Sequence, residues 1–310
     1  MKKKVIFWGS PEFAVPFLAG LLKKGFEVPL VVTQPDKPKG RKKEPQPTAV
    51  KEFAVKQGLK VFAPKKLKGN INLIEVLRRE EPDYFVVMAY GKILPPEILE
   101  IPAIAPVNVH ASLLPKYRGA APIQWAIMNG ERETGITIMI MNERMDEGDI
   151  LAQERVPIRF DDYIEDLEQR LISTGVDLLI KTLIEFSEGK IKPQPQIGEP
   201  SYAPLIKKED GKINWSEDAV SIYNKIRALT RWPTAYTFLN GKRINIYRAL
   251  PLDVESSEKP GTIVRAEKEL LVSTGKGILS ILELQREGKK RLPVKDFLAG
   301  ARLKAGEVFE

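Results

Sequence analysis

Short, almost continuously apolar runs alternate with helix-like segments through the first half of the chain. The apolar runs lie at 5–8, 28–34, 84–89, 107–110 and 136–141, and the segments between them repeat apolar residues every three or four positions. Strands that are apolar on both faces are typical of a parallel sheet covered by helices on both sides. The alternation therefore predicts an α/β fold with a doubly wound, mostly parallel, Rossmann-like sheet.

The pattern changes after a helix expected at 163–187. Residues 190–207 contain several prolines and little periodicity, which indicates an extended linker. Beyond the linker, short strands separated by Gly and Asn turns predict a small antiparallel β-barrel of the OB-like kind. We therefore expect an α/β domain over 1–189, a proline-rich linker over 190–207 and a barrel domain over 208–310.

The composition excludes several kinds of site. The 310 residues contain no cysteine and one histidine, His110. Without cysteine there is no disulfide scaffold, thiolate nucleophile or cysteine-ligated zinc, and one histidine excludes the usual sites with two or three histidines. A carboxylate site for Mg²⁺ or Ca²⁺ stays open, but no spaced acidic loop indicates one, so we expect a metal-free mechanism. No apolar run approaches the ~18 residues of a membrane helix, and we expect a cytoplasmic protein.

Positive charge is concentrated in one segment. The net charge is +8 and the pI about 9.3, which suggests an anionic partner. Residues 35–47, PDKPKGRKKEPQP, combine prolines and a glycine with five lysines or arginines. This composition offers no apolar side chain that could pack, so we expect a mobile loop. Taken alone, it is equally well explained as solvated surface.

The turn after the first predicted strand argues against a nucleotide cofactor. It reads Gly9-Ser10-Pro11-Glu12-Phe13 and contains one glycine. A dinucleotide-binding turn needs three glycines, so that the backbone can approach a pyrophosphate. A nicotinamide enzyme, or a phosphoribosyl substrate seated on this turn, is therefore disfavoured.

Asn108 and His110 lie two positions apart at the end of a predicted strand. Alternate strand residues point to the same side, so both side chains can converge on one pocket. That pocket would lie at the carboxyl end of the sheet, where open α/β folds bind their ligands. Considered alone, a histidine at a strand end is more often a hydrogen-bonded structural residue.

A wider motif changes that interpretation. Residues 108–122, NVHASLLPKYRGAAP, resemble the active-site segment of the 10-formyltetrahydrofolate-dependent formyltransferases. Nearly the whole chain shares the resemblance, through GSPEF at 9–13, TQPD at 33–36, AYGKILP at 89–95, TGIT at 134–137, MDEGDI at 145–150, WP at 232–233 and LQREGKK at 284–290.

In the family members that act on methionyl-tRNA, the matching Asn, His and Asp form a catalytic trio, which implies Asn108, His110 and Asp146 here. These residue types suit the reaction. Attack of an amine on the formyl carbon gives a tetrahedral state with a negative oxygen, to which the Asn108 amide and a protonated His110 can donate hydrogen bonds. A carboxylate beside the imidazole favours its charged form and can take the proton of the amine through water.

The resemblance also implies 10-formyltetrahydrofolate as co-substrate and two segments that hold it. A pterin is flat and rich in hydrogen-bond donors and acceptors, so exposed backbone groups at strand ends are suited to bind it. Leucine and isoleucine in these segments are equally well explained as ordinary core. The implied folate-binding residues are Ser112, Leu113, Leu114 and Pro115 in one segment and Tyr90, Gly91 and Ile93 in the other.

Members of the family differ in the molecule that accepts the formyl group. The resemblance implies initiator methionyl-tRNA, because Gly40-Arg41-Lys42-Lys43 matches a loop that contacts the acceptor arm in those members. Arg41, Lys42 and Lys43 are then the implied tRNA-binding residues, with the barrel as a tRNA-binding domain. The expected oligomeric state is a monomer.

Other acceptors and activities stay open. Amino-sugar nucleotide formyltransferases share both the active-site segment and a barrel-like second domain, and they are the main alternative. Glycinamide ribonucleotide formyltransferases fit less well, because they carry a glycine-rich first loop that is absent here. A non-catalytic RNA-binding protein and a folate-dependent hydrolase are weaker alternatives.

Overall fold

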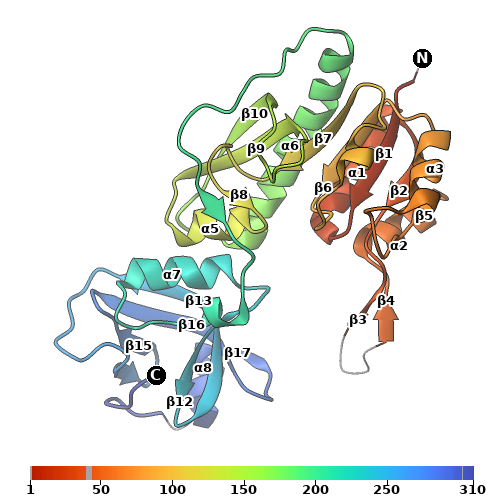
Figure 1. Ribbon diagram of the computed structural model, residues 1–310. Helices are drawn as coiled ribbons and strands as arrows, with labels where there is room; N and C mark the ends of the chain where they lie inside the picture. The colour runs from red at the N-terminus through yellow and green to blue at the C-terminus, as the bar shows by residue number, and fades with distance from the viewer. Residues whose placement is uncertain (1, 40–43, 302) are drawn as a thin grey trace. The chain divides into compact units, whose positions relative to one another are not determined.

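The computed structural model describes residues 2–39, 44–301 and 303–310, which form two compact units (Figure 1). The first unit comprises Met1–Pro122, Glu133–Pro157 and Glu168–Pro204. The second comprises Ile123–Arg132, Ile158–Leu167 and Leu205–Glu310, so two short segments from the first half of the chain belong with the C-terminal residues. Among the described helices, none combines the length and the apolar composition that crossing a bilayer requires.

A seven-stranded sheet forms the centre of the first unit, in the order β10-β9-β7-β6-β1-β2-β5. The five strands from β7 to β5 run parallel, and β9 and β10 are antiparallel additions at one edge. This confirms the expected doubly wound, mostly parallel sheet. The strands are β1 (Lys4–Gly9), β2 (Glu27–Val32), β5 (Val61–Phe62), β6 (Tyr84–Met88), β7 (Ala105–His110), β9 (Glu133–Ile140) and β10 (Ile150–Pro157).

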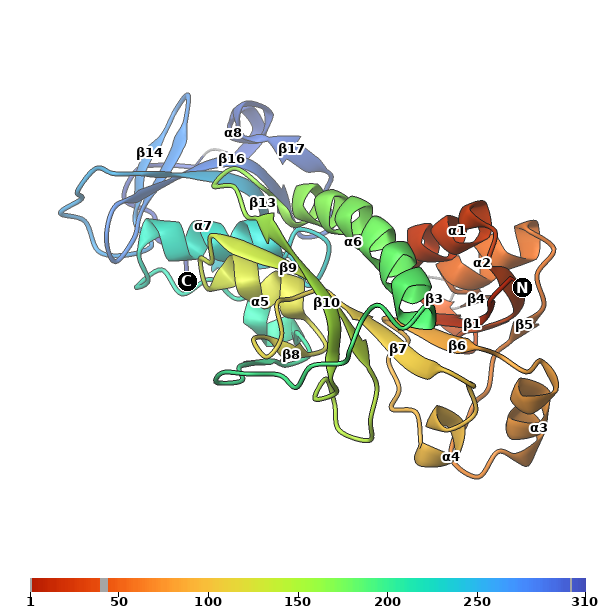
Figure 2. The same cartoon turned by 90° about the horizontal axis from the view of Figure 1, so that it is seen from above.

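Helices cover both faces of this sheet (Figure 2). On one face lie α1 (Val15–Lys24) and, from Glu168 onward, α6 (Ile164–Ser187), while α3 (Ile71–Arg79) and α4 (Pro96–Leu99) lie on the other. Gly20 lets α1 approach α6 closely, since a Cβ there would come within 2.5 Å of the Val176 side chain. The first unit also contains η1 (Glu12–Ala14) and α2 (Ala49–Lys56), whereas α5 (Pro122–Met128) belongs to the second unit from Ile123 onward.

The basic segment contains more regular structure than its composition predicts. The short strands β3 (Lys37–Lys39) and β4 (Glu44–Gln46) pair antiparallel. These six residues can pair because a hairpin is held by backbone hydrogen bonds and does not need apolar side chains. The predicted tRNA-binding residues Arg41, Lys42 and Lys43 lie outside the described residues.

The predicted linker is extended, and much of it is bound to the first unit. Gln194 pairs with Ile150 in an isolated antiparallel bridge. Further on, β11 (Tyr202–Ala203) pairs in parallel with β8 (Arg118–Gly119). We call residues 194–203 the strap. Its pairing partners are β8, in the segment that follows β7, and Ile150, the first residue of β10.

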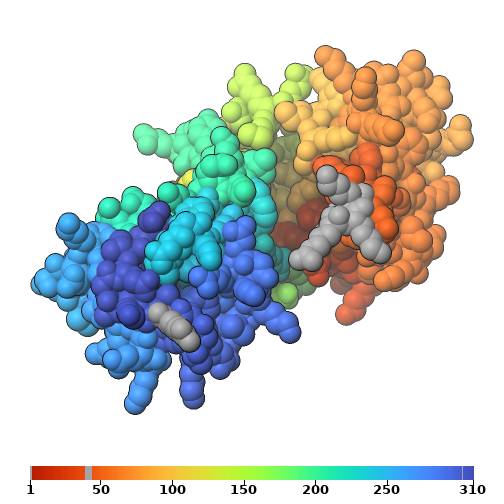
Figure 3. Space-filling view, turned by 90° about the horizontal axis from the view of Figure 1, so that it is seen from below, coloured from red at the N-terminus to blue at the C-terminus, as the bar shows by residue number. Residues whose placement is uncertain are grey.

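The C-terminal unit contains an antiparallel sheet in the order β12-β13-β16-β15-β14, with β17 paired to β16. The C-terminal residues join its two edges: Phe238 of β12 exchanges backbone hydrogen bonds with Glu310, and Ile263 of β14 donates to the Glu307 carbonyl. In Figure 3 the dark blue C-terminal segment lies beside the cyan region that contains β12. This closure confirms the expected small antiparallel barrel.

Alternate strand residues fill the barrel, and α7 covers it with Ile222 and Ile226. Ile246 and Ala249 on β13 pair with Leu284 and Ile281 on β16 in this core. The elements are η2 (Lys208–Gly211), α7 (Ala219–Ala228), β12 (Ala235–Leu239), β13 (Lys242–Leu252), β14 (Ile263–Ala266), β15 (Leu270–Ser273), β16 (Ile278–Arg286), β17 (Arg291–Pro293) and α8 (Val294–Ala301).

Asp218 caps the amino end of α7, and this cap predicts a pH-dependent stability. Its carboxylate accepts hydrogen bonds from the Ser221 hydroxyl at 2.7 Å and the Ser221 amide at 2.9 Å. These bonds, the hydroxyl first, lower the pKa of Asp218 below its ordinary value of 3.8. A depressed folded-state pKa stabilises the fold above the unfolded value, and the effect is lost as pH falls through the folded value.

We expect Asp218→Ala to lower the free energy of unfolding at pH 7 by about 1 kcal/mol, and by less below pH 3. Asp218→Asn is the matched control, because asparagine also caps helices but does not titrate. It should retain most of the stability at pH 7. Urea unfolding at both pH values measures the effect, and an equal loss for Asp218→Ala at both would contradict the cap's dependence on charge.

Candidate active site

Three side chains from two segments meet at the carboxyl end of the sheet. Asn108 and His110 lie at the end of β7, and Asp146 lies in the loop between β9 and β10. Asn108 Nδ2 donates to Asp146 Oδ1 at 3.4 Å, and His110 Nδ1 lies 3.7 Å from Asp146 Oδ2. The structure thus brings together all three residues that the sequence singled out for catalysis.

The surroundings of His110 determine which ring nitrogen is available for chemistry. The residue is 5% exposed, and its Nε2 lies 2.9 Å from the Tyr117 carbonyl oxygen. Because a carbonyl oxygen only accepts, Nε2 carries a hydrogen and donates it. Nδ1, the other ring nitrogen, faces the Asp146 carboxylate. In the protonated ring, Nδ1–H and Oδ2 form an ion pair.

Asp146 is held by two neighbouring segments. Its φ of 56° lies in the left-handed region, which non-glycine residues seldom adopt without outside support. The Gly119 amide donates to its Oδ2 at 2.8 Å, and the Gln196 side-chain amide donates to its backbone carbonyl at 2.8 Å. Contacts to both the side chain and the backbone therefore determine where the carboxylate lies.

The turn that the resemblance assigns to the folate is stabilised by one hydroxyl group. Thr137 Oγ1 donates to the Ser112 carbonyl at 2.6 Å and accepts from the Leu114 amide at 3.2 Å and from Gln153 Nε2 at 2.8 Å. Ser112 and Leu114 are buried, whereas Leu113 and Pro115 are half-buried. In this turn, core packing explains Leu114, and Leu113 and Pro115 remain accessible to a ligand.

The second segment that the resemblance assigns to the folate follows β6. Tyr90 is buried beside Trp8, with ring centroids 5.2 Å apart, and burial raises the pKa of Tyr90 to about 12. Its carbonyl accepts from Gln34 Nε2 at 2.7 Å. Gly91 is exposed. Ile93 is 69% exposed, so the interpretation of Ile93 as ordinary core is wrong.

Sequence reasoning missed the polar residues that join the strap to the site. Arg118 donates to Gln196 Oε1 through Nε at 3.2 Å and Nη2 at 2.7 Å, and its Nη1 pairs with Glu147 at 3.1 Å. Ser201 Oγ accepts from the Tyr117 amide at 2.9 Å. Gln196 and Ser201 lie in an aperiodic, proline-rich segment, where no local pattern marks a residue that contacts a distant loop.

No group of three or more His, Asp or Glu side chains that could hold a metal ion occurs within residues 2–39, 44–301 and 303–310. A hollow of about 340 Å³ lies on the loop between β9 and β10, lined by Asn142, Glu143, Arg144 and Glu147.

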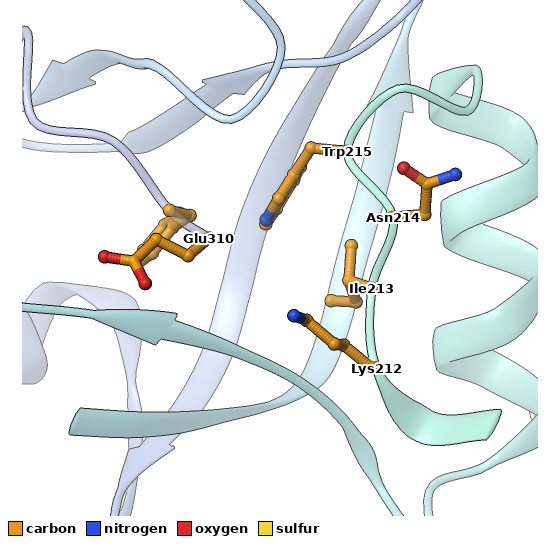
Figure 4. A pocket seen from close by; sticks show the side chains of 6 residues that line it. Lys212, Ile213, Asn214, Trp215 and Glu310 are labelled. Carbon is orange, nitrogen blue, oxygen red and sulfur yellow. The ribbon is translucent and has the colours of Figure 1, made fainter. Parts of the chain in front are cut away.

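The C-terminal unit has a hollow of about 420 Å³ that none of the trio lines (Figure 4). The Trp215 ring stacks on Phe309 with centroids 5.6 Å apart, and its Nε1 donates to Thr237 at 2.9 Å. These contacts belong to the closure of the barrel by the C-terminal residues. The lining residues are Lys212, Ile213, Asn214, Trp215, Phe309 and Glu310.

Two family models match the chain: "Formyl transferase" over residues 1–183 and "Formyl transferase, C-terminal domain" over residues 205–302. A methionyl-tRNA formyltransferase of Thermodesulfovibrio yellowstonii is 48% identical over 306 residues, which are 99% of this chain and 98% of the relative.

Solved structures share the fold at lower identity. HypX from Aquifex aeolicus in complex with tetrahydrofolic acid matches with a TM-score of 0.67 and 18% identity over 99% of this chain, which spans half (50%) of HypX. An N-formyltransferase from Helicobacter canadensis, in complex with folinic acid and dTDP-3-aminofucose, matches with a TM-score of 0.66 and 23% identity over 92% of this chain and 100% of that one. With both domain models matched and close identity over nearly its whole length, the chain belongs to the formyl transferase family.

Proposed function

We propose that this chain transfers the formyl group of 10-formyltetrahydrofolate to the free amino group of initiator methionyl-tRNA. The meeting of Asn108, His110 and Asp146 at the carboxyl end of the sheet carries the proposal. The choice of acceptor is supported by 48% identity to a methionyl-tRNA formyltransferase, against 23% to the formyltransferase solved with an amino-sugar nucleotide. This difference favours tRNA over the amino-sugar alternative.

Each member of the trio has a role in direct transfer. The amine attacks the formyl carbon, and Asn108 Nδ2–H and His110 Nδ1–H donate to the oxygen that becomes negative. The Asp146 carboxylate receives the amine proton through water and stabilises the charged imidazole. The C–N bond to the carrier then breaks. The carrier nitrogen takes up one proton, which balances the proton that the amine has lost. The amine is itself the nucleophile, so no covalent enzyme intermediate is needed.

The folate carrier is proposed to lie between the two segments that follow β6 and β7. These strands are neighbours, so both segments start at the same edge of the sheet. Leu113 and Pro115 offer accessible apolar surface, Gly91 offers exposed backbone, and the exposed Ile93 side chain can cover a flat ring. Ser112, Leu114 and Tyr90 would act through the backbone that they hold in place.

The tRNA is proposed to contact Arg41, Lys42 and Lys43 and the C-terminal domain, residues 208–310, which follows the catalytic domain and the linker. The barrel carries arginines over aromatic rings: Arg243 lies 3.7 Å from the centroid of Tyr236, and Arg291 lies 4.2 Å from that of Tyr247. Such pairs suit a phosphate backbone and unstacked bases. The reaction would take place in the cytoplasm, where aminoacyl-tRNA is used.

Arg41→Ala is expected to raise KM for methionyl-tRNA and leave KM for 10-formyltetrahydrofolate unchanged. Loss of one phosphate contact should also reduce the slope of log KM against log salt by about one unit. Steady-state kinetics at several salt concentrations measure both effects. Arg79→Ala, which removes an exposed arginine at the end of α3, is the control. An Arg41→Ala enzyme with unaltered tRNA kinetics would show that Arg41 does not bind the acceptor.

The proposed reaction is tested by incubating the protein with 10-formyltetrahydrofolate and methionyl-tRNA. We expect formylmethionyl-tRNA and tetrahydrofolate in equal amounts, measured by mass spectrometry after mild hydrolysis of the tRNA ester. Release of formate without formylmethionine would instead support the folate-dependent hydrolase, and binding of tRNA without any turnover would support a non-catalytic protein.

A further inference from the structure

The strap, residues 194–203, contacts the catalytic loop through one side chain, that of Gln196. We propose that Gln196 is a positioning residue, which holds the backbone of the Asp146 loop so that the carboxylate faces His110. This inference rests on the proposed function, because it gives Gln196 a role only through Asp146.

Both ends of the Gln196 amide are used. The NH₂ group donates to two carbonyls of the catalytic loop, those of Asp146 at 2.8 Å and Gly148 at 2.9 Å. The oxygen accepts two hydrogen bonds from Arg118, at 2.7 and 3.2 Å. Arg118 in turn pairs with Glu147, which lies between the two tethered carbonyls in sequence. The Gln196 amide therefore binds Asp146 and Gly148 directly and Glu147 through Arg118. Since Arg118 lies in the segment after β7, these contacts join the loop to that segment.

The loop needs this support because of its conformation. Asp146 has a φ of 56°, and residues 142–145 are exposed. Left-handed backbone at a non-glycine residue costs free energy, so the loop would relax toward another conformation if its tethers were removed. A movement of about 1 Å would take the carboxylate away from His110 Nδ1, and displacements of that size reduce turnover strongly.

A second contact of the strap works in the same direction. The carbonyl oxygen of Ala203 in β11 accepts a hydrogen bond from the amide of Ala120 at 2.9 Å. The same oxygen lies 2.5 Å from the position that a Cβ on Gly119 would occupy. Gly119 is the residue whose amide donates to Asp146 Oδ2. The strap therefore contacts Gly119, whose amide binds the Asp146 carboxylate, through Ala203. It contacts the backbone of Asp146 through Gln196.

The test uses Gln196→Met, which keeps the volume of the side chain and removes its four hydrogen bonds. We expect kcat for formyl transfer to fall about 10- to 100-fold, with KM for both substrates within twofold of wild type. Gln194→Met is the matched control: Gln194 is exposed, its backbone pairs with Ile150, and in the described chain its side chain has no hydrogen-bond partner. It should keep wild-type kcat.

A second variant separates the two halves of the contact. Gln196→Glu can still accept from Arg118 but cannot donate to the carbonyls of Asp146 and Gly148. We expect a loss of kcat similar to that of Gln196→Met. Wild-type kcat in Gln196→Glu would contradict the tether to the loop and overturn the proposal, and this variant decides the matter if Gln196→Met fails to fold.

The single histidine provides a direct readout of position. In ¹⁵N-labelled protein, the ring-nitrogen resonances belong to His110 without further assignment. We expect the Nδ1 resonance of Gln196→Met to move from its wild-type position toward that of Asp146→Asn. Reduced kcat with an unmoved resonance, or unchanged kcat, would overturn the proposal. Full activity of Asp146→Asn would be a different failure, because it would remove the catalytic role on which the proposal rests.

Discussion

Asp146→Asn should lower kcat for formyl transfer at least ~10²-fold, the usual cost of removing such a catalytic group. Asparagine can accept the Gly119 hydrogen bond and adopts left-handed backbone more readily than most residues, so the loop should keep its shape. The variant nevertheless lacks the charge that faces His110 Nδ1 and cannot take a proton from the amine. The loss should therefore fall on kcat, with KM for the folate near wild type.

Single-turnover formyl transfer measures this effect, because it separates the chemical step from release of the product. Asp149→Asn provides a matched control: the same substitution three residues away, at an exposed side chain in the same loop. It should leave the rate of the chemical step unchanged. A folded Asp146→Asn enzyme with near-normal single-turnover rates would refute the assignment of Asp146.

Gly148→Ala is expected to have an effect of similar size for a steric reason. A Cβ at Gly148 would overlap the carbonyl oxygen of Ile140, which is backbone within β9 and cannot move aside. The loop would have to shift, together with the Gly148 carbonyl that Gln196 binds and the neighbouring Asp146. We expect kcat/KM to fall by about 10²-fold, accompanied by a lower melting temperature.

Gly300→Ala is the control for that variant, because an added Cβ at Gly300 meets nothing within 4 Å. Activity and thermal unfolding are measured for both variants. Wild-type activity in Gly148→Ala would mean that the catalytic loop tolerates displacement, which would contradict the tight positioning of Asp146 argued above.

Much of the fold follows from hydrophobic periodicity, and the exceptions have a common cause. Runs that are apolar on both faces correctly predict the buried parallel strands, because burial on two sides leaves no polar positions. The hairpin of β3 and β4 and the attachment of the strap were not predicted. The hairpin pairs residues that are polar or proline, and the strap is attached through the two residue pairs Tyr202–Arg118 and Ala203–Gly119. Hydrophobic periodicity reports burial of side chains along an element and does not report such backbone pairing.

The candidate site also contains some residues that the sequence predicts and others that it does not. The spacing of Asn108 and His110 on one strand is enough to predict that they converge. Asp146 comes from another loop and entered through the family resemblance alone. Gln196 could not be predicted, because its partners are backbone carbonyl groups of distant residues. Every residue carries such a group, so the residue types do not indicate which carbonyl is bound. Contacts of this kind become visible only in three dimensions.

The central claim, formyl transfer to methionyl-tRNA, is tested most directly by comparing acceptors under identical conditions. Methionyl-tRNA, an amino-sugar nucleotide and glycinamide ribonucleotide would each be supplied with 10-formyltetrahydrofolate, and kcat/KM measured for each. We predict that methionyl-tRNA exceeds both small acceptors by at least ~10³-fold, because only tRNA can also engage the basic hairpin and the barrel domain. A higher kcat/KM for either small acceptor would contradict the account.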